Sequence, residues 1–169
     1  ALAAVAAAVT FNVPLAQIKL ALKNVKLTGK RQEIVQLGAV TVINDAYNAS
    51  PASMASALKT LHAVKAAKGG RAVAVLADML ELGQLSVSAH TEVGEMAAAE
   101  GVDILITYGK EAVNTGKAAQ KGGVKTFICQ NRTEAAKILS GIVRNNDIIL
   151  LKGSHSMQVD GLIDLVLKK

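Results

Sequence analysis

Three polar loops of this sequence carry residue types that could do chemistry. The first contains Asp45, Tyr47 and Asn48 and leads into a helix that begins at Pro51. A carboxylate such as Asp45 can accept a hydrogen bond from a ribose hydroxyl, and the amides at a helix start attract anions. Asn48 and Ser50 can instead build the turn and cap the helix. For Ser50 the pattern favours capping, whereas for Asp45 and Asn48 residue spacing leaves both roles open.

The second loop, residues 77–83, contains Asp78 and Glu81. Two carboxylates after an apolar strand could hold an ammonium group or a metal-bound water, but their spacing does not define a metal site. The alternative is a solvent-facing loop. His90 lies on the following helix; histidine is a residue type suited to acid–base chemistry, although a lone helical histidine more often packs or faces solvent.

The third loop contains Lys152, Gly153, Ser154 and His155. A lysine, a flexible glycine and hydroxyl groups after a strand suit a phosphate or a carboxylate. Neither the GxxxxGK[ST] phosphate loop nor the GxGxxG dinucleotide fingerprint occurs in the sequence.

The composition describes a globular protein with an excess of positive charge. The chain has 169 residues, of which 51% are apolar and 19% are charged, and its formal charge is +6. This length allows one ordinary domain with part of a neighbour attached. The charge favours anionic ligands, although most lysines serve a solvated surface. Nucleic acid is not an expected partner, because two Phe, two Tyr and no Trp make a stacking platform improbable.

Cys129 is the single cysteine, so it forms no internal disulfide and offers no metal-ligand spacing. It ends an apolar run, which favours a buried structural thiol in a protein of the reducing cytoplasm. The Ala- and Val-rich start lacks a basic leader and is too short to span a membrane. We therefore interpret it as a truncated helix and expect no membrane insertion.

The elements that position these loops follow from hydrophobic periodicity. Two helices, 1–10 and 14–23, precede a change of pattern, so we place the domains at 1–27 and 28–169. An apolar stripe on the second helix comprises Leu15, Ile18, Leu22 and Val25. The expected strands are 34–37 and 40–43, as a hairpin, then 72–76, 104–107, 124–129 and 147–151. The expected helices are 51–68, 88–100, 110–120, 131–143 and a last one from about Met157.

Short apolar strands that alternate with amphipathic helices predict an α/β domain with a mostly parallel sheet covered on both faces. The right-handed crossover rule makes this a Rossmann-like, doubly wound sheet. Ligands of such sheets bind at the carboxyl ends of the strands, and the three polar loops lie there.

Four stretches of the sequence resemble the MurF ligases, a branch of the Mur ligase family. Residues 45–51 (DAYNASP), with Ser53-Met54 and Ala57-Leu58, are similar to the signature DxYNAxPxSMxxAL. Residues 75–83 (VLADMLELG), with His90 and Val93-Gly94, are similar to a second signature. Residues 151–157 (LKGSHSM) look like LKGSRxM, and Arg31 and Glu33 like the Arg-x-Glu that opens the domain. They occur in family order over nearly the whole chain.

The resemblance implies the C-terminal domain of an ATP-dependent ligase. ATP would phosphorylate the carboxylate of the UDP-N-acetylmuramoyl-tripeptide, and the amine of D-alanyl-D-alanine would displace the phosphate. Mg²⁺ would neutralise the ATP phosphates. Such chemistry needs cations on the transferred phosphoryl group, an aligned amine and exclusion of water.

Site roles follow from the resemblance residue by residue. Arg31 and Asp45 would hold the nucleotide. Substrates would meet Tyr47, Asn48, Asp78, Glu81, Gly153, Ser154 and His155, with His90 near the dipeptide. No catalytic residue is assigned; the cleft candidates are Asn48, Asp78, His90 and Lys152.

The sequence departs from the family at His155, where the usual residue is Arg, because a neutral imidazole cannot form the bidentate fork of a guanidinium. Ser50 and Ala77 replace the usual Asn and Gly.

The family's GKT loop, modified lysine and main Mg²⁺ ligands belong to a central domain, whose last helices residues 1–23 resemble. The partners would thus include the chain's own central and N-terminal domains, and we expect the chain alone to fold but not to ligate. Rival interpretations are a MurE or folylpolyglutamate ligase domain and a stand-alone nucleotide-binding domain.

Overall fold

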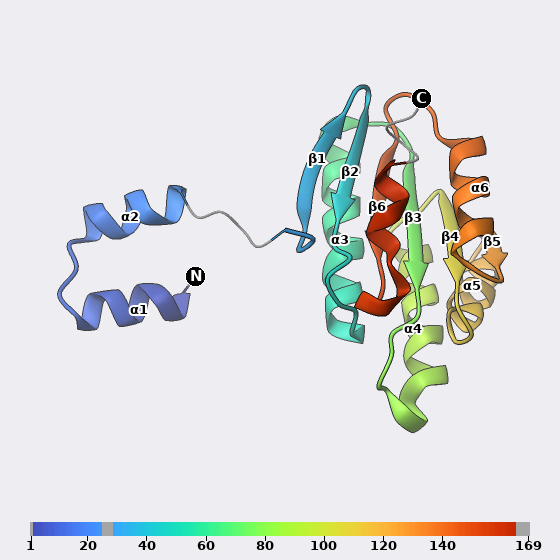
Figure 1. Ribbon diagram of the computed structural model, residues 1–169, viewed down its shortest axis with the longest axis horizontal. Coiled ribbons are helices and arrows are strands. Elements are labelled where there is room, and N and C mark those ends of the chain that lie inside the picture. The colour runs from blue at the N-terminus through green and yellow to red at the C-terminus, as the bar shows by residue number, and fades with distance from the viewer. Residues whose placement is uncertain (1, 25–28, 165–169) are drawn as a thin grey trace.

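A six-stranded sheet with strand order β1-β2-β6-β3-β4-β5 forms the centre of the structure, a computed structural model that describes residues 2–24 and 29–164 (Figure 1). The strands are β1 (Glu33–Leu37), β2 (Val40–Asn44), β3 (Ala72–Ala77), β4 (Ile104–Tyr108), β5 (Lys125–Cys129) and β6 (Ile148–Lys152). The β1–β2 hairpin is antiparallel and every other pairing is parallel. The predicted doubly wound α/β sheet is confirmed.

Helices cover both faces of the sheet (Figure 1). On one face lie α3 (Pro51–Lys68), α4 (Ser86–Ala99) and α5 (Ala112–Lys121), packed on strand residues such as Ile43 and Leu105. On the other lie α6 (Arg132–Ile142) and the 3₁₀ helix η3 (Val159–Leu162), packed on residues such as Ile106 and Ile149. Because successive strand side chains point to opposite faces, wholly apolar strands such as β3 and β6 supply both cores.

Two of these helices have the side-chain N-caps that the sequence predicted. Ser50 accepts a hydrogen bond from the Ser53 amide, and Ser53 Oγ in turn accepts from the Ser50 amide, so the pair forms a capping box before Pro51. At α6 the Asn131 side chain accepts from the Glu134 amide. The predicted capping role of Ser50 is confirmed.

The prediction that the last helix begins at about Met157 is wrong. Residues 155–162 form two short 3₁₀ helices, η2 (His155–Met157) and η3, separated by Gln158, whose φ of 51° is left-handed. This backbone conformation interrupts a right-handed helix. The predicted inward residues Val159 and Leu162 are buried. Val166 and Leu167 lie outside the described residues.

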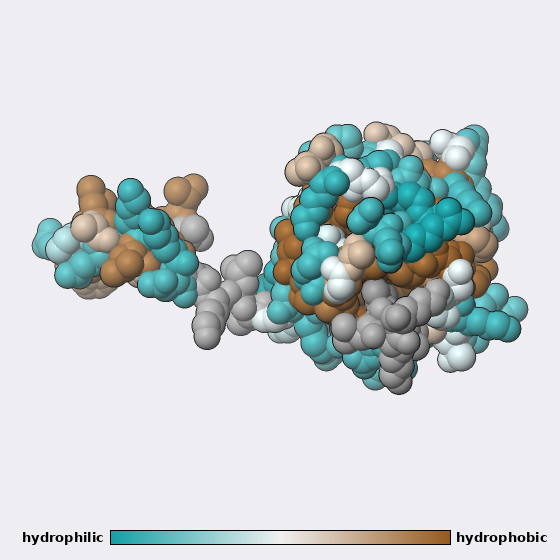
Figure 2. Space-filling model, turned by 90° about the horizontal axis from the view of Figure 1, so that it is seen from above, coloured by the Kyte–Doolittle hydropathy of each residue, from teal (hydrophilic) through white to brown (hydrophobic). Residues whose placement is uncertain are grey.

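The helices α1 (Leu2–Thr10) and α2 (Leu15–Lys23) form as predicted, but their apolar side chains are largely exposed. Of the expected stripe, Ile18 is buried, Leu15 is 71% exposed and Leu22 is 42% exposed; Val25 lies outside the described residues. Figure 2 shows brown apolar patches between teal hydrophilic residues on the lobe that holds this helical pair. Among the described helices, none is long and apolar enough to cross a membrane.

Gly94 lets α4 and α5 approach closely. A Cβ added there would lie 2.3 Å from the Thr115 carbonyl oxygen and 2.7 Å from the Ala118 Cβ. We expect Gly94→Ala to lower the free energy of unfolding by about 1–3 kcal/mol, because backbone atoms must shift. Gly141→Ala in α6 is the control, since a Cβ there has open space; it should be neutral or stabilise by up to about 1 kcal/mol. Urea unfolding of both variants measures the difference, and equal changes would contradict this packing.

Cys129 is buried at the end of β5, as predicted. Burial, with a smaller contribution from Glu134, raises the pKa of its thiol to about 11. At pH 8 we expect the Cys129 thiol to react with a disulfide reagent at least about a hundredfold more slowly in the folded chain than in the urea-unfolded chain. The reason is that a rise of about two units in the thiol pKa lowers the thiolate fraction about a hundredfold. The unfolded thiol loses its proton first as the pH rises, so the free energy of unfolding should fall above about pH 9. Equal folded and unfolded reaction rates would contradict the assignment.

Candidate functional site

The three polar loops meet at the carboxyl edge of the sheet, around two adjoining pockets. The first pocket, of about 670 Å³, is lined by Arg31, Gln32, Asp45, Tyr47, Asn48, Ala49, Ser50, Ala52, Ser53, Ser56 and Lys152. The second, of about 640 Å³, is lined by Tyr47, Asn48, Ala49, Ser50, Leu80, Glu81, Leu82, Ser154, His155 and Ser156. The segment from Tyr47 to Ser50 borders both. The predicted convergence of the loops is therefore confirmed.

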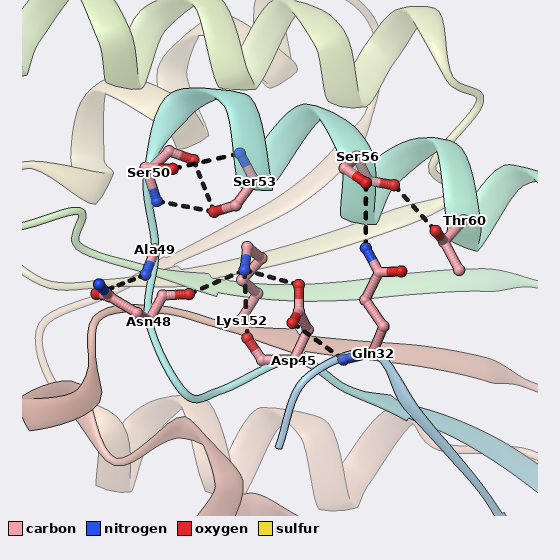
Figure 3. Close-up of polar contacts among 9 residues, drawn as sticks. All are labelled: Gln32, Asp45, Asn48, Ala49, Ser50, Ser53, Ser56, Thr60 and Lys152. Atoms are coloured by element: carbon pink, nitrogen blue, oxygen red, sulfur yellow. Dashed lines mark hydrogen bonds and ion pairs between the residues drawn. The ribbon is translucent and has the colours of Figure 1, made fainter. Parts of the chain in front are cut away.

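A buried ion pair connects the first loop to the third. The Lys152 side chain is 1% exposed, and its Nζ donates to Asp45 Oδ2 at 2.7 Å (Figure 3). Nζ also donates to the main-chain oxygens of Asn48, at 2.9 Å, and Asp45, at 3.3 Å. Because β6 lies between β2 and β3, this lysine fixes the loop after β2 to the middle of the sheet. Lys152 thus holds protein atoms, not a free position in the cleft.

Asp45 also binds the segment that precedes β1 at the edge of the first pocket. Its Oδ1 accepts the amide of Gln32 at 3.0 Å, while the Gln32 side chain donates to Ser56 Oγ at 3.1 Å (Figure 3). Gln32 has a left-handed φ of 48°, an uncommon conformation for a residue other than glycine. The sequence reasoning missed Gln32, because it acts mainly through its backbone amide and belongs to no motif.

Arg31 and Tyr47 present a cation and an aromatic ring at the pocket surface. The Arg31 guanidinium carbon lies 4.0 Å from the centroid of the Tyr47 ring, a distance typical of cation–π contacts. The ring also lies beside that of His155, with the two ring centroids 6.1 Å apart. Both Arg31 and His155 are exposed, so Arg31 can meet an anion in the first pocket and His155 one in the second.

Asp78 lines neither pocket of the described chain. It is buried, and its two carboxylate oxygens accept the amides of Lys110, Glu111 and Ala112 at 2.7–3.1 Å. The carboxylate thus satisfies the free amides at the start of α5, which also carry the positive end of the helix dipole. The predicted direct contact of Asp78 with a substrate does not fit this geometry.

His90 is also buried and lines neither pocket. Its Nε2 accepts the amide of Met79 at 3.0 Å, so it holds the loop of residues 78–82 from behind. Gly153 lies behind the pockets as well: a Cβ there would meet Val159 Cγ2 at 2.7 Å and Ala77 Cβ at 2.8 Å. Both residues therefore shape the loops behind the two pockets.

Ser154 has a double role in the second pocket. Its amide donates to the Asp78 carbonyl oxygen at 3.0 Å, and its hydroxyl accepts the Leu80 amide at 2.9 Å. Tyr108 supports the same region by donating its hydroxyl to the Met157 carbonyl at 2.6 Å, and burial raises the pKa of this phenol. The turn that carries His155 is thereby anchored to β4.

Glu81 projects from the surface of the second pocket. It is exposed, and its φ of 65° is left-handed. Glu81 and His155 both line the second pocket. A pocket with an acidic group and a basic group suits a small zwitterion that carries an ammonium and a carboxylate.

The described residues do not fit a magnesium site. Over residues 2–24 and 29–164, no group of three or more His, Cys, Asp or Glu side chains could hold a metal ion. Asp45, which lines the first pocket, and Asp78, which lies behind the second, are already bonded to Lys152 and to backbone amides. We therefore assign no metal ligand among residues 2–24 and 29–164.

The fold and the site define a Rossmann-like α/β domain whose carboxyl edge carries a cationic and aromatic pocket beside a pocket of mixed charge. The sequence profile of the family described as "Mur ligase, glutamate ligase domain" matches residues 30–155. The chain belongs to this family.

Relatives and solved structures agree with this assignment. The UDP-N-acetylmuramoyl-tripeptide--D-alanyl-D-alanine ligases of Bacillus subtilis and Escherichia coli are 33% and 32% identical to the chain and cover 98% and 96% of it. A crystal structure of MurF from Acinetobacter baumannii superposes with a TM-score of 0.87 at 27% identity over 99% of the chain. The chain spans 37% and 35% of the two ligases and 36% of the crystallised protein.

The Lys152–Asp45 pair provides a test of the site's framework. We expect Lys152→Met to lower the free energy of unfolding by about 3–5 kcal/mol, because it leaves the Asp45 carboxylate buried without its cation. The double variant Lys152→Met/Asp45→Asn should lose less, since no charge remains unpaired. Lys30→Met, which breaks the more exposed 2.6 Å pair with Asp160, is the control and should change stability by less than about 1 kcal/mol. Urea unfolding measures all three, and a Lys152→Met loss no larger than that of Lys30→Met would refute the framework.

Proposed function

We propose that this chain is the C-terminal domain of the ligase that joins D-alanyl-D-alanine to the UDP-N-acetylmuramoyl-tripeptide in peptidoglycan synthesis, at the expense of ATP. The observation that carries the proposal is spatial: the family-like segments around Arg31, Asp45, Glu81 and Ser154 come from separate parts of the sequence and border two adjoining pockets. The names of the B. subtilis and E. coli relatives support the same reaction.

The first pocket is the proposed nucleotide site. Arg31 is exposed beside Tyr47 and can reach a phosphate oxygen, which a guanidinium binds as a charged fork. Asp45 already accepts from Lys152 and Gln32. A carboxylate has about four acceptor positions, so a ribose hydroxyl can still be bound. A MurF structure from Thermotoga maritima, which shares the fold at 23% identity, was solved in complex with ADP.

The second pocket is the proposed site of D-alanyl-D-alanine. Glu81 would attract the ammonium end of the dipeptide, and His155 with the hydroxyls of Ser154 and Ser156 would face its carboxylate. Tyr47 and Asn48 border both pockets, so they would lie between the nucleotide and the dipeptide. This placement suits a reaction in which the amine attacks an activated acyl group next to the ATP phosphates.

The remaining parts of the reaction would come from outside this chain. A central domain would cleave ATP and supply the Mg²⁺ ligands, and an N-terminal domain would hold the UDP-linked tripeptide. We take residues 1–27 as the helical tail of that central domain and residues 28–169 as the closing domain. The whole enzyme would work in the cytoplasm, and the 169-residue chain alone would not ligate.

The full-length protein that carries this chain tests the proposal directly. We expect it to form ADP and the extended muramoyl pentapeptide only when ATP, Mg²⁺, the tripeptide and D-alanyl-D-alanine are all present. Arg31→Ala should raise KM for ATP by about 10- to 100-fold, the loss of one charged hydrogen bond. Arg144→Ala, which removes an exposed arginine just before β6 at the opposite edge of the sheet, is the control and should leave KM unchanged.

Two results would contradict the proposal. Full-length protein that forms no product with all four components rules out the ligase assignment. An Arg31→Ala variant with the ATP affinity of the control rules out the first pocket as the nucleotide site.

A further inference from the structure

The turn of residues 78–82 carries Glu81 into the second pocket, and three neighbouring elements hold it in place. Asp78 is bonded to the start of α5, Leu80 donates to Ser154, and Met79 donates to His90 on α4. The first two contacts involve residues near the pocket or at a helix cap. The third involves a histidine that is 1% exposed and that the proposed reaction does not use.

We propose that His90 is a positioning residue for the amine substrate, because it fixes the main chain of the turn that presents Glu81 to the second pocket. This inference rests on the proposed function, since it concerns the dipeptide site. His90 touches no ligand itself. It acts through the Met79 amide, two residues before Glu81.

The hydrogen bonds of His90 define its proton state. A backbone amide can only donate, so Nε2, which lies 3.0 Å from the Met79 nitrogen, must be an acceptor without a proton. Nδ1 lies 2.8 Å from the Ser86 carbonyl oxygen, which can only accept, so Nδ1 carries the proton. The ring is therefore neutral, with its proton on Nδ1. Thr115 on α5 also contacts His90: its hydroxyl donates to the His90 carbonyl oxygen at 2.9 Å.

Loss of the His90 Nε2 acceptor would disturb the turn of residues 78–82 more than the rest of the fold. Met79 is 1% exposed, so its amide would remain buried without a partner unless the backbone moved. The nearby residues are conformationally demanding, because Glu81 and Gly83 both have left-handed φ values, 65° and 54°. Movement of the main chain at Met79 would therefore displace the Glu81 carboxylate. The first pocket contains no residue of this turn and should be unaffected.

Steady-state kinetics of the full-length protein separate the two pockets. We expect His90→Leu to raise KM for D-alanyl-D-alanine by about tenfold, the effect of one lost buried acceptor, with KM for ATP changed less than about twofold. His90→Gln should restore much of the affinity, because its amide oxygen can accept from Met79 while its NH₂ group donates to Ser86. Thr115→Val is the matched control: it removes a buried hydrogen bond to His90 but leaves the Met79 contact, so both KM values should stay near those of the wild type.

Histidine-selective ¹⁵N NMR of the same full-length protein provides a second readout. The His90 ring should show the nitrogen shifts of a neutral imidazole protonated on Nδ1, and the Met79 amide signal should move in His90→Leu but not in Thr115→Val. The inference is overturned if the ring is protonated on Nε2, if both KM values rise in parallel in a folded His90→Leu variant, or if Gln rescues nothing. A wild-type protein that does not ligate would instead overturn the proposed function, and the NMR result would still decide the proton state of His90.

Discussion

The buried contact between Lys152 and Asp45 is the interaction on which the site depends. The lysine ends β6, whose neighbours in the sheet are β2 and β3. Its ammonium group reaches the loop after β2, and Asp45 in turn holds the Gln32 amide, which brings Arg31 to the same edge. One ion pair therefore aligns three chain segments that are distant in sequence. The β1–β2 pairing and the hydrogen bond from the Tyr47 amide to the Lys30 carbonyl oxygen, at 2.9 Å, hold the Arg31 and Tyr47 segments together beside the first pocket as well.

Stability alone does not explain why such a pair is buried. Removing two charges from water is costly, and an apolar pair of similar volume often stabilises a fold as well or better. Lys152 is tolerated at 1% exposure because its Nζ has three acceptors, two of them main-chain oxygens. An apolar side chain would leave those loop carbonyls without a donor. The pair thus contributes loop geometry more than folding energy.

Much of the fold could be predicted from the sequence, because alternating apolar runs report directly on strands and helix faces. The beginning of the last helix could not, since the left-handed backbone at Gln158 leaves no mark in a hydrophobic pattern. The three loops of the site were predictable from the rule that places ligands at strand ends. The roles of individual residues were not. Asp78 binds the amides that lead into α5, of which the first, Lys110, lies 32 residues further along the chain, and no local spacing indicates that distance.

The site residues divide into a buried framework and an exposed contact surface, although sequence signatures contain both. Lys152, Asp78 and His90 are buried and bonded to the main chain, whereas Arg31, Tyr47, Glu81 and His155 are exposed at the pockets. A substitution on the exposed side can therefore change ligand contacts without disturbing the loops. His155, which replaces the family's usual arginine, lies on that side next to Tyr47. The difference between imidazole and guanidinium should accordingly affect how a carboxylate is bound, through one contact in place of a two-pronged fork, and leave the framework beneath it intact.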